Sequence, residues 1–247
     1  MEGPHAVAAA LDAGAILEDL LVEPGGDVDP ELDGLVARAR AAGVPTAELE
    51  PGTLARVTDA VTPQPVVAVA RWCDVALDEV AAAAARPGAG PVLVLPDVRD
   101  PGNVGTLVRT AEAAGAGAVV VAGTSADLFG PKAVRSSAGA VFHVPLVVAP
   151  DGDDALDALA AAGLRLVGTA ADAATAHDEA DLTGPLALVL GNEADGLPPA
   201  VLERVDERVA IPIEGRAESL NVAAAGAVLC FEAARQRRRL AGGGDNR

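Results

Sequence analysis

The sequence has 247 residues, 51% of them apolar, and its 36 acidic and 18 basic residues give a formal net charge of −18. Acidity of this size argues against non-specific binding to nucleic acid, which depends on attraction to phosphate, although it leaves room for a local basic patch. With one Trp, three Phe and no Tyr, the chain lacks an aromatic platform for stacking bases, which argues against recognition-motif and single-strand-binding folds.

The two cysteines, Cys73 and Cys230, lie far apart in the chain and match no metal-ligand spacing. We therefore expect two buried, reduced thiols and no metal site. The N-terminus lacks the basic region of a signal peptide, and the longest apolar run, residues 222–231, is too short to span a bilayer. These features indicate a soluble, cytoplasmic protein without a membrane segment.

Helical and extended patterns alternate over residues 1–71, which predicts a small α/β sandwich domain. The expected helices are 6–13, 30–42 and 53–59, and the expected strands are 16–22, 44–49 and 66–70. This part carries 12 acidic and 4 basic residues, a net charge of −8. Residues 72–90 then read as a helix followed by a Pro/Gly-rich segment, so we expect a linker and a domain boundary there.

Residues 91–247 are predicted to form a second domain around a parallel sheet. Its strands are short runs that are apolar on both faces, with helical patterns between them, which is typical of a parallel sheet covered on both sides. We expect strands at 92–95, 118–122, 164–167, 186–190 and 207–211, and helices at 104–114, 131–137, 154–162, 198–205 and 220–240.

Ligands bind such sheets beyond the carboxyl ends of the strands. Three segments occupy that position, and we call them the first, second and third site stretches: residues 96–109, 191–196 and 211–221.

The first site stretch contains Gly102 and Gly105, which let backbone approach a ligand or a neighbouring loop at a helix start. It has neither the glycine fingerprint of a dinucleotide site nor the Lys of a phosphate loop. Asn103 and Arg109 are six residues apart, so both can lie on one side of a helix. An arginine in an otherwise apolar helix is either functional or a surface and helix-pairing residue.

The other two stretches also place polar residues at strand ends. Glu193 follows a buried strand, where it is either a functional carboxylate or part of a polar loop. In the third stretch, Pro212 ends a strand and Ser219 is predicted to cap the following helix. Asn221 would stand beside unpaired N–H groups, a place that suits a polar ligand or an anion, although a well-capped connection explains the same residues.

The three stretches together resemble the ordered motifs of the SpoU/TrmH branch of the SPOUT RNA methyltransferases. The matching segments are Gly-Asn-Val-Gly-Thr-Leu-Val-Arg-Thr-Ala, Leu-Gly-Asn-Glu-Ala-Asp-Gly-Leu and Ile-Pro-Ile-Glu-Gly-Arg-Ala-Glu-Ser-Leu-Asn-Val-Ala, and the resemblance covers about residues 91–236. Residues 1–71, with Glu-Gly-Pro-His-Ala-Val near their start and Val-Thr-Pro-Gln-Pro-Val-Val-Ala-Val near their end, resemble the L30e-like substrate-binding domain of the ribosomal RNA members.

The resemblance implies a deep trefoil knot over about residues 186–236, a homodimer, and S-adenosylmethionine as cofactor. It implies methyl transfer to a ribose 2′-hydroxyl of RNA, with ribosomal RNA preferred and transfer RNA as the alternative. By motif position, the cofactor-binding residues would be Leu190, Gly191, Gly196, Ile211 and Leu220. The catalytic and substrate-site residues would be Asn103, Arg109, Glu193, Ser219 and Asn221.

The chemistry requires a 2′-hydroxyl to lose its proton, yet none of the three stretches contains a histidine. Arginine is effectively always protonated, so we interpret Arg109 as a cation that binds the adjacent phosphate and stabilises the developing alkoxide. Two other classes stay open at this point. One is a non-catalytic RNA-binding or ribosome-assembly factor with the same fold, and the other is a nucleotide-dependent dehydrogenase, which the missing glycine fingerprint disfavours.

Overall fold

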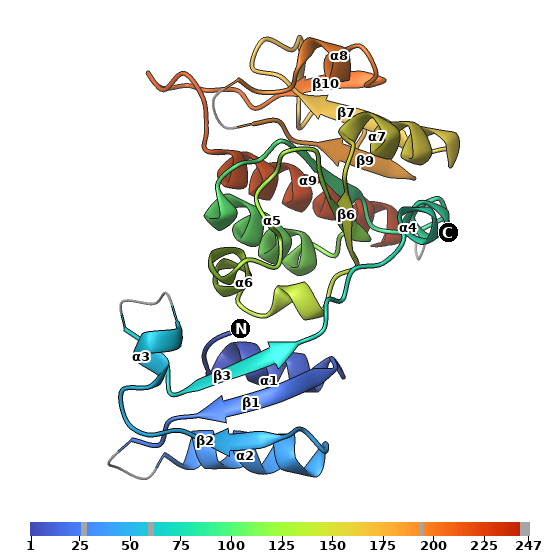
Figure 1. Cartoon of the computed structure of the whole chain (residues 1–247). Helices are drawn as coiled ribbons and strands as arrows, with labels where there is room; N and C mark the ends of the chain where they lie inside the picture. The colour runs from blue at the N-terminus through green and yellow to red at the C-terminus, as the bar shows by residue number, and fades with distance from the viewer. Residues whose placement is uncertain (26–28, 59–61, 193–194, 243–247) are drawn as a thin grey trace.

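The computed structural model describes residues 1–25, 29–58, 62–192 and 195–242. The chain forms two α/β parts, each with its own sheet (Figure 1). Among the helices described, none combines the length and apolar composition needed to cross a lipid bilayer.

The smaller part is built on a three-stranded sheet of order β2-β1-β3. The central strand β1 (Leu17–Val22) pairs in parallel with β2 (Thr46–Glu48) and antiparallel with β3 (Val66–Ala70). Apolar residues of α1 (Pro4–Asp12) and α2 (Pro30–Ala41) are buried against this sheet in one cluster, and α3 (Leu54–Val57) follows β2. The predicted small α/β arrangement is confirmed, with β2 and α3 shorter than expected.

Helix α4 (Leu77–Ala84) lies within the predicted linker and packs on the larger sheet. Its residues Val80, Ala81 and Ala84 are buried in the same cluster as Val92 of β4 (Val92–Pro96) and Leu156 of α7 (Gly152–Ala161). The limits of the two domains and of the linker between them stay a prediction.

The larger sheet has seven strands in the order β6-β5-β4-β9-β7-β10-β8, and every pair of neighbours is parallel. In chain order the strands are β4 (Val92–Pro96), β5 (Ala118–Ala122), β6 (Leu146–Ala149), β7 (Arg165–Thr169), β8 (Thr175–Ala176), β9 (Leu186–Val189) and β10 (Glu207–Ala210). The helices are α5 (Pro101–Ala113), α6 (Pro131–Ser137), η1 (Ala140–Phe142), α7 (Gly152–Ala161), α8 (Pro199–Leu202) and α9 (Val222–Gly242).

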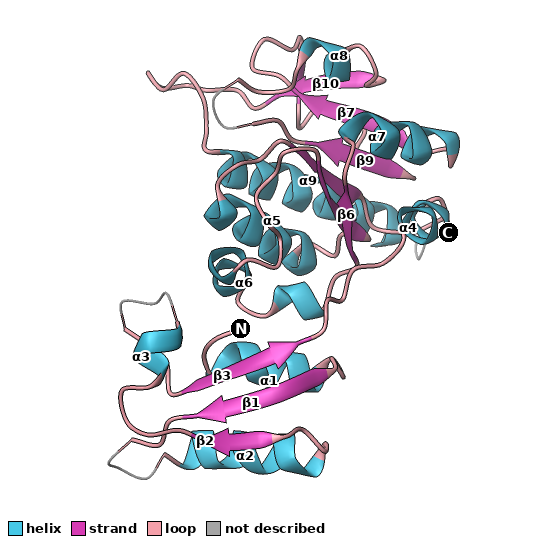
Figure 2. Ribbon diagram, in the orientation of Figure 1, coloured by secondary structure: helices cyan, strands magenta, loops and turns pink. Residues whose placement is uncertain are grey.

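Helices cover both faces of this sheet (Figure 2). Along β4, Leu93 and Leu95 are buried in a cluster shared with α5 and α9, whereas Val92 and Val94 are buried in a cluster shared with α4 and α7. Because successive strand residues point to opposite faces, a sheet covered on both sides needs continuous apolar runs. The predicted parallel sheet is confirmed.

Two strands, β6 and β8, were not expected from the sequence. Strand β6 has only four residues, and Pro145 and Pro150 flank it. Strand β8 has two residues and exists through its pairing with β10, with Val209 opposite Thr175 and Ala210 opposite Ala176. Such short segments carry little periodicity of their own, and tertiary pairing makes them strands.

The strand order places the three site stretches at one edge of the sheet. From β4 the chain proceeds through β5 to β6 on one side, whereas β9, β7 and β10 lie on the other. The order therefore reverses between β4 and β9, which is where ligands bind in open parallel sheets. The first stretch follows β4, the second follows β9 and the third follows β10. The knot over residues 186–236 stays a prediction.

Candidate active site

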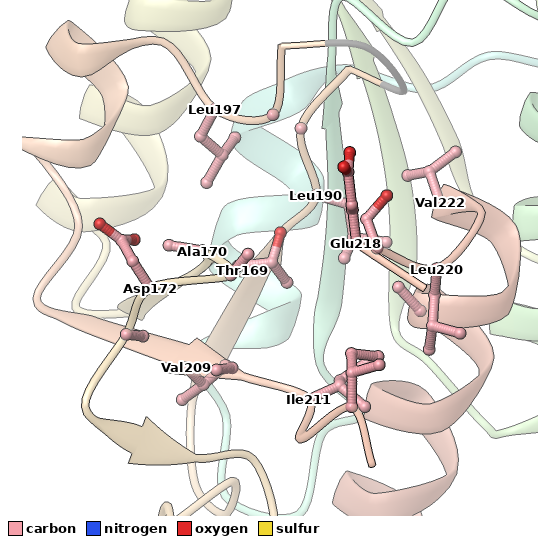
Figure 3. A pocket seen from close by; sticks show the side chains of 18 of the residues that line it. Thr169, Ala170, Asp172, Leu190, Leu197, Val209, Ile211, Glu218, Leu220 and Val222 are labelled. Carbon is pink, nitrogen blue, oxygen red and sulfur yellow. The ribbon is translucent and has the colours of Figure 1, made fainter. Parts of the chain in front are cut away.

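A cleft of about 790 Å³ lies at the carboxyl ends of β9, β7 and β10 (Figure 3). The second and third stretches form much of its wall. All five residues expected to bind the cofactor line the cleft, and so does Ser219: Leu190, Gly191, Gly196, Ile211, Leu220 and Ser219. The cleft therefore collects the predicted cofactor residues from two separate loops.

The second stretch closes on itself as a tight loop. The N–H of Asn192 donates to the carbonyl of Gly196 and the N–H of Gly196 donates to the carbonyl of Asn192, each at 3.0 Å. The Asn192 Nδ2 also donates to the carbonyl of Asp97 at 2.8 Å, which ties this loop to the first stretch. Glu193 lies outside the described residues.

Gly191 is required by a close approach of backbone. A Cβ built on Gly191 would lie 2.2 Å from the carbonyl carbon of Gly196 and 2.4 Å from the nitrogen of Leu197. No side chain fits between these backbone segments, so a glycine at position 191 allows the start of the second stretch to lie against the segment at Gly196 and Leu197.

The third stretch differs from the sequence expectation in its cap. Helix α9 begins at Val222, and the N-cap is Asn221, whose Oδ1 accepts from the N–H groups of Ala223 at 2.9 Å and Ala224 at 3.3 Å. The prediction that Ser219 caps this helix is wrong, because Ser219 lies two residues too far upstream to reach those N–H groups. Ser219 is instead exposed at the cleft.

The first stretch holds the N-terminus of α5 in a fixed position. Asp100 caps the helix by accepting from the N–H of Gly102 at 2.6 Å and of Asn103 at 3.1 Å. A hydrogen bond from Lys132, whose Nζ lies 3.1 Å from Asp100 Oδ2, together with these N–H groups lowers the pKa of Asp100. Lys132 belongs to α6, so the interaction also joins α6 to the start of α5.

Asn103 and Asn221 are brought into direct contact. The Nδ2 of Asn221 donates to the Oδ1 of Asn103 at 3.1 Å, joining the first turn of α5 to the cap of α9. These two residues are 118 positions apart in the chain, and the sequence predicted both as site residues without predicting their contact.

Arg109 does not line the cleft. It follows Asn103 by six residues along α5, about 9 Å at the helical rise of 1.5 Å per residue. Its side chain is exposed, makes no hydrogen bond or ion pair with the described part of the chain, and does not line the cleft. Within one protomer, Arg109 is therefore not among the residues that line the cleft.

The loop after β7 also lines the cleft and was not predicted as part of the site. Thr169, Ala170 and Asp172 line the cleft opposite Leu220 and Glu218 (Figure 3). The sequence could have indicated this loop, because residues 164–167 were predicted as a strand and the carboxyl ends of parallel strands lie at one edge of the sheet. The charged residues that line the cleft, among those the structure describes, are the carboxylates Asp172, Asp195 and Glu218, and no arginine or lysine lines it.

The chain matches two family profiles. The SpoU rRNA methylase family matches residues 90–231, and the RNA 2′-O ribose methyltransferase substrate-binding family matches residues 1–71. A relative from Bacillus subtilis (strain 168), the 23S rRNA (guanosine(2553)-2′-O)-methyltransferase RlmP, is 36% identical over 231 residues, which cover 94% of this chain and 86% of the relative.

Solved structures agree with the profiles. The SpoU methyltransferase AviRb from Streptomyces viridochromogenes, in complex with the cofactor AdoMet, superposes with a TM-score of 0.84 at 32% identity, covering 97% of this chain and 90% of AviRb. An AdoMet-bound rRNA methyltransferase from Sinorhizobium meliloti superposes with a TM-score of 0.83 at 32% identity, covering 95% of this chain and 86% of that protein. The chain belongs to the SpoU rRNA methylase family.

Proposed function

We propose that this protein transfers a methyl group from S-adenosylmethionine to a ribose 2′-hydroxyl of 23S ribosomal RNA. The observation that carries the proposal is the cleft at the carboxyl ends of the parallel strands, lined by residues of the second and third stretches. The family supports the same chemistry, because the relative from Bacillus subtilis is named for 2′-O-methylation of 23S rRNA and two similar structures are named as AdoMet complexes.

The cleft fits S-adenosylmethionine in size, polarity and charge. Its volume of about 790 Å³ lies in the range of cofactor sites, and its walls combine apolar side chains with loop backbone. The carboxylates of Asp172, Asp195 and Glu218 make it complementary to a cationic ligand. S-adenosylmethionine carries its methyl group on a positively charged sulfonium. The residues that would hold it are Leu190, Gly191, Gly196, Ile211 and Leu220.

Arg109 is proposed to act on the RNA as a cation. The site stretches offer no histidine to serve as a base, and an arginine stays protonated. An exposed guanidinium without a partner in the described chain can bind the phosphate next to the target ribose and stabilise the developing alkoxide. Ser219 is proposed to orient the ribose, Asn103 and Asn221 to complete the substrate side, and Glu193 to fix the loop of the second stretch.

The active form is proposed to be a knotted homodimer in the cytoplasm. Support for the dimer comes from the apolar side chains that one protomer exposes on and just before α9: Leu220 at 40%, Val228 at 36% and Phe231 at 46%. Val228 and Phe231 are three residues apart on α9 and so lie on one face of the helix, and a contiguous exposed apolar patch marks an interaction surface. The named activity of the relatives on ribosomal RNA supports a cytoplasmic location.

The test is transfer of labelled methyl from S-adenosylmethionine to an unmodified 23S rRNA transcript, with a transfer RNA pool alongside and Arg109→Ala as control. We expect label in the ribosomal RNA, mapped to a ribose and lost in the variant. Arg109→Lys should also lose most turnover, because lysine cannot reproduce the bidentate fork of arginine. Label in transfer RNA only would contradict the proposal that ribosomal RNA is the substrate. Cofactor binding without methyl transfer to either RNA would favour a non-catalytic RNA-binding factor.

A further inference from the structure

The larger sheet has an exposed edge at β6. This strand is the last in the order of strands on its side, next to β5. The carbonyl of Pro145 accepts from the N–H of Val119 at 2.9 Å, and the carbonyl of Ala149 accepts from the N–H of Gly123 at 3.1 Å. Because backbone groups alternate in direction along a strand, the N–H and C=O of Val148 point away from β5. They face the outer edge of the sheet.

The position beside β6 is filled only at the start of the strand. Asp74 pairs in parallel with Leu146, and the N–H of Val75 donates to the carbonyl of Leu146 at 2.8 Å. The chain then leaves the edge and begins α4 at Leu77. Within the described part of the chain, the N–H and C=O of Val148 have no hydrogen-bond partner, and Val148 is 45% exposed. Such an edge is a template for pairing with another extended chain.

A groove of about 440 Å³ lies beside this edge. It is bounded by β6, by the segment that enters α4 and by the first turn of α7. Its floor is apolar, because Val147 and Ala149 of β6 and Ala155 of α7 belong to the buried cluster on this face of the sheet, and Leu77 packs against that cluster. The groove therefore combines unpaired backbone at Val148 with apolar surface for side chains.

The charge of the groove indicates which chain would fit it. Among the described residues, the charged ones that line it are the carboxylates Asp74, Asp151 and Asp154. Asp151 caps α7, whereas Asp74 and Asp154 are exposed and form no ion pair with the described part of the chain. Carboxylates repel RNA phosphate, and they would repel the same acidic rim on a second copy of this chain, which carries a net charge of −18. A basic chain is complementary to them.

We infer that the edge of β6 binds a basic, extended peptide segment of a partner protein by strand addition. The backbone of the peptide exchanges hydrogen bonds with Val148. Its apolar side chains pack on the floor at Val147 and Ala149, and its lysines or arginines face Asp74 and Asp154. This site is separate from the cleft at the carboxyl ends of β9, β7 and β10, and the inference does not depend on the proposed function.

The probe is the acetylated and amidated peptide Lys-Val-Val-Lys-Val-Lys, which presents apolar and basic side chains on both faces of an extended strand. Its counterpart Glu-Val-Val-Glu-Val-Glu has the same β-forming residues and the opposite charge. The full-length protein is titrated into each fluorescently labelled peptide, and anisotropy gives the Kd. We expect saturable binding of the lysine peptide, weakened by added salt, and no binding of the glutamate peptide.

Three variants separate strand addition from general attraction of charge. Val148→Pro removes the outward N–H and leaves the hydrogen bonds between β6 and β5 in place. Asp74→Lys reverses one charge at the rim. Glu112→Lys is the matched control, because it makes the same change in net charge at an exposed position of α5, on the opposite face of the sheet. Tm of each variant checks that the fold is retained.

We expect Val148→Pro and Asp74→Lys each to raise the Kd of the lysine peptide about 5-fold or more, and Glu112→Lys to leave it unchanged. Hydrogen exchange at the Val148 amide of the wild type should slow when the peptide binds. The absence of saturable binding would overturn the inference. Equal weakening by Glu112→Lys, or binding that leaves exchange at Val148 unchanged, would reduce the interaction to general charge attraction and overturn it as well.

Discussion

Replacing Gly191 with alanine tests whether the close approach of its backbone to Gly196 and Leu197 shapes the cleft. Gly191 lies between β9 and the loop that returns through Gly196, and both residues line the cleft. An alanine Cβ would lie 2.2 Å from the carbonyl carbon of Gly196, 2.4 Å from the nitrogen of Leu197 and 2.5 Å from the oxygen of Gly196. All three atoms belong to the backbone, so no flexible side chain can move aside.

The size of the effect follows from these distances. Real Cβ atoms stay at least 3.0 Å from such neighbours, so the loop has to move by about 0.8 Å from its present 2.2 Å contact. Overpacking of this kind costs about 1–3 kcal/mol. Because the displaced segment is the cleft wall itself, we expect the cost to weaken S-adenosylmethionine binding by about 5- to 150-fold if all of it falls on binding, at about 1.4 kcal/mol per tenfold.

The assay is titration calorimetry with S-adenosylmethionine, together with the denaturation midpoint of the free protein. Gly215→Ala is the matched control, because it lies in the third stretch and its Cβ would meet nothing within 4 Å. We expect the control to keep both the affinity and the midpoint of the wild type. If Gly191→Ala kept the wild-type affinity for S-adenosylmethionine and the wild-type denaturation midpoint, the close backbone approach at Gly191 would not shape the cofactor site.

Three further predictions concern α9 and its contacts. Hydrogen bonds from Arg235 and then Gln236 lower the pKa of Glu232 from 4.5 to about 2. The ionised carboxylate therefore stabilises the fold above pH 4.5, and this contribution is lost as the pH falls toward 2, so Glu232→Gln should flatten the fall of Tm between these pH values. Burial raises the pKa of Cys230 to about 12. At pH 8 a thiol reagent should therefore label the half-buried Cys73 first and Cys230 only as the protein unfolds, and mass spectrometry of the labelled peptides would detect this order. Arg237→Ala should lower the free energy of unfolding by about 1–2 kcal/mol, because the guanidinium donates to the carbonyls of Ala114 and Gly115, each at 3.1 Å. Arg238 is exposed, so the control variant Arg238→Ala should change the free energy of unfolding by less than about 0.5 kcal/mol.

The parallel sheet could be predicted because its strands have to be apolar on both faces. Runs such as 118–122 and 186–190 are short and are separated by helical patterns, which favours buried strands over helices, and they locate the edge where the site stretches meet. The position of the α9 cap could not be predicted in this way, since Ser219 and Asn221 are both good N-cap residues. Tertiary packing decides between them: Val222 is 7% exposed and starts the buried face of the helix, whereas Leu220 is 40% exposed.

The contact between Asn103 and Asn221 was also beyond the reach of the sequence. Each residue can be assigned to the start of a helix from local pattern, but their contact depends on α5 and α9 lying side by side at a distance set by Gly226. The contacts of the arginines near the end of α9 could not be predicted from the sequence either. As a cluster they fit either RNA binding or a solvated helix end, and the structure divides them. Arg235 pairs with Glu232, Arg237 binds the end of α5, and Arg238 and Arg239 are exposed.

The charge of residues 1–71 limits how this part can approach RNA. Three of its four arginines form ion pairs on its own surface, Arg38 with Asp12, Arg40 with Glu48 and Arg71 with Glu18. Cations compensated by neighbouring carboxylates attract phosphate weakly, and this part has a net charge of −8 before any pairing is considered. In the proposed complex, we expect attraction to the RNA backbone to come from exposed cations of the larger part, among them Arg109, Arg238 and Arg239. In the proposed complex with RNA, we expect the smaller part to recognise the shape of the RNA and to form hydrogen bonds to its backbone.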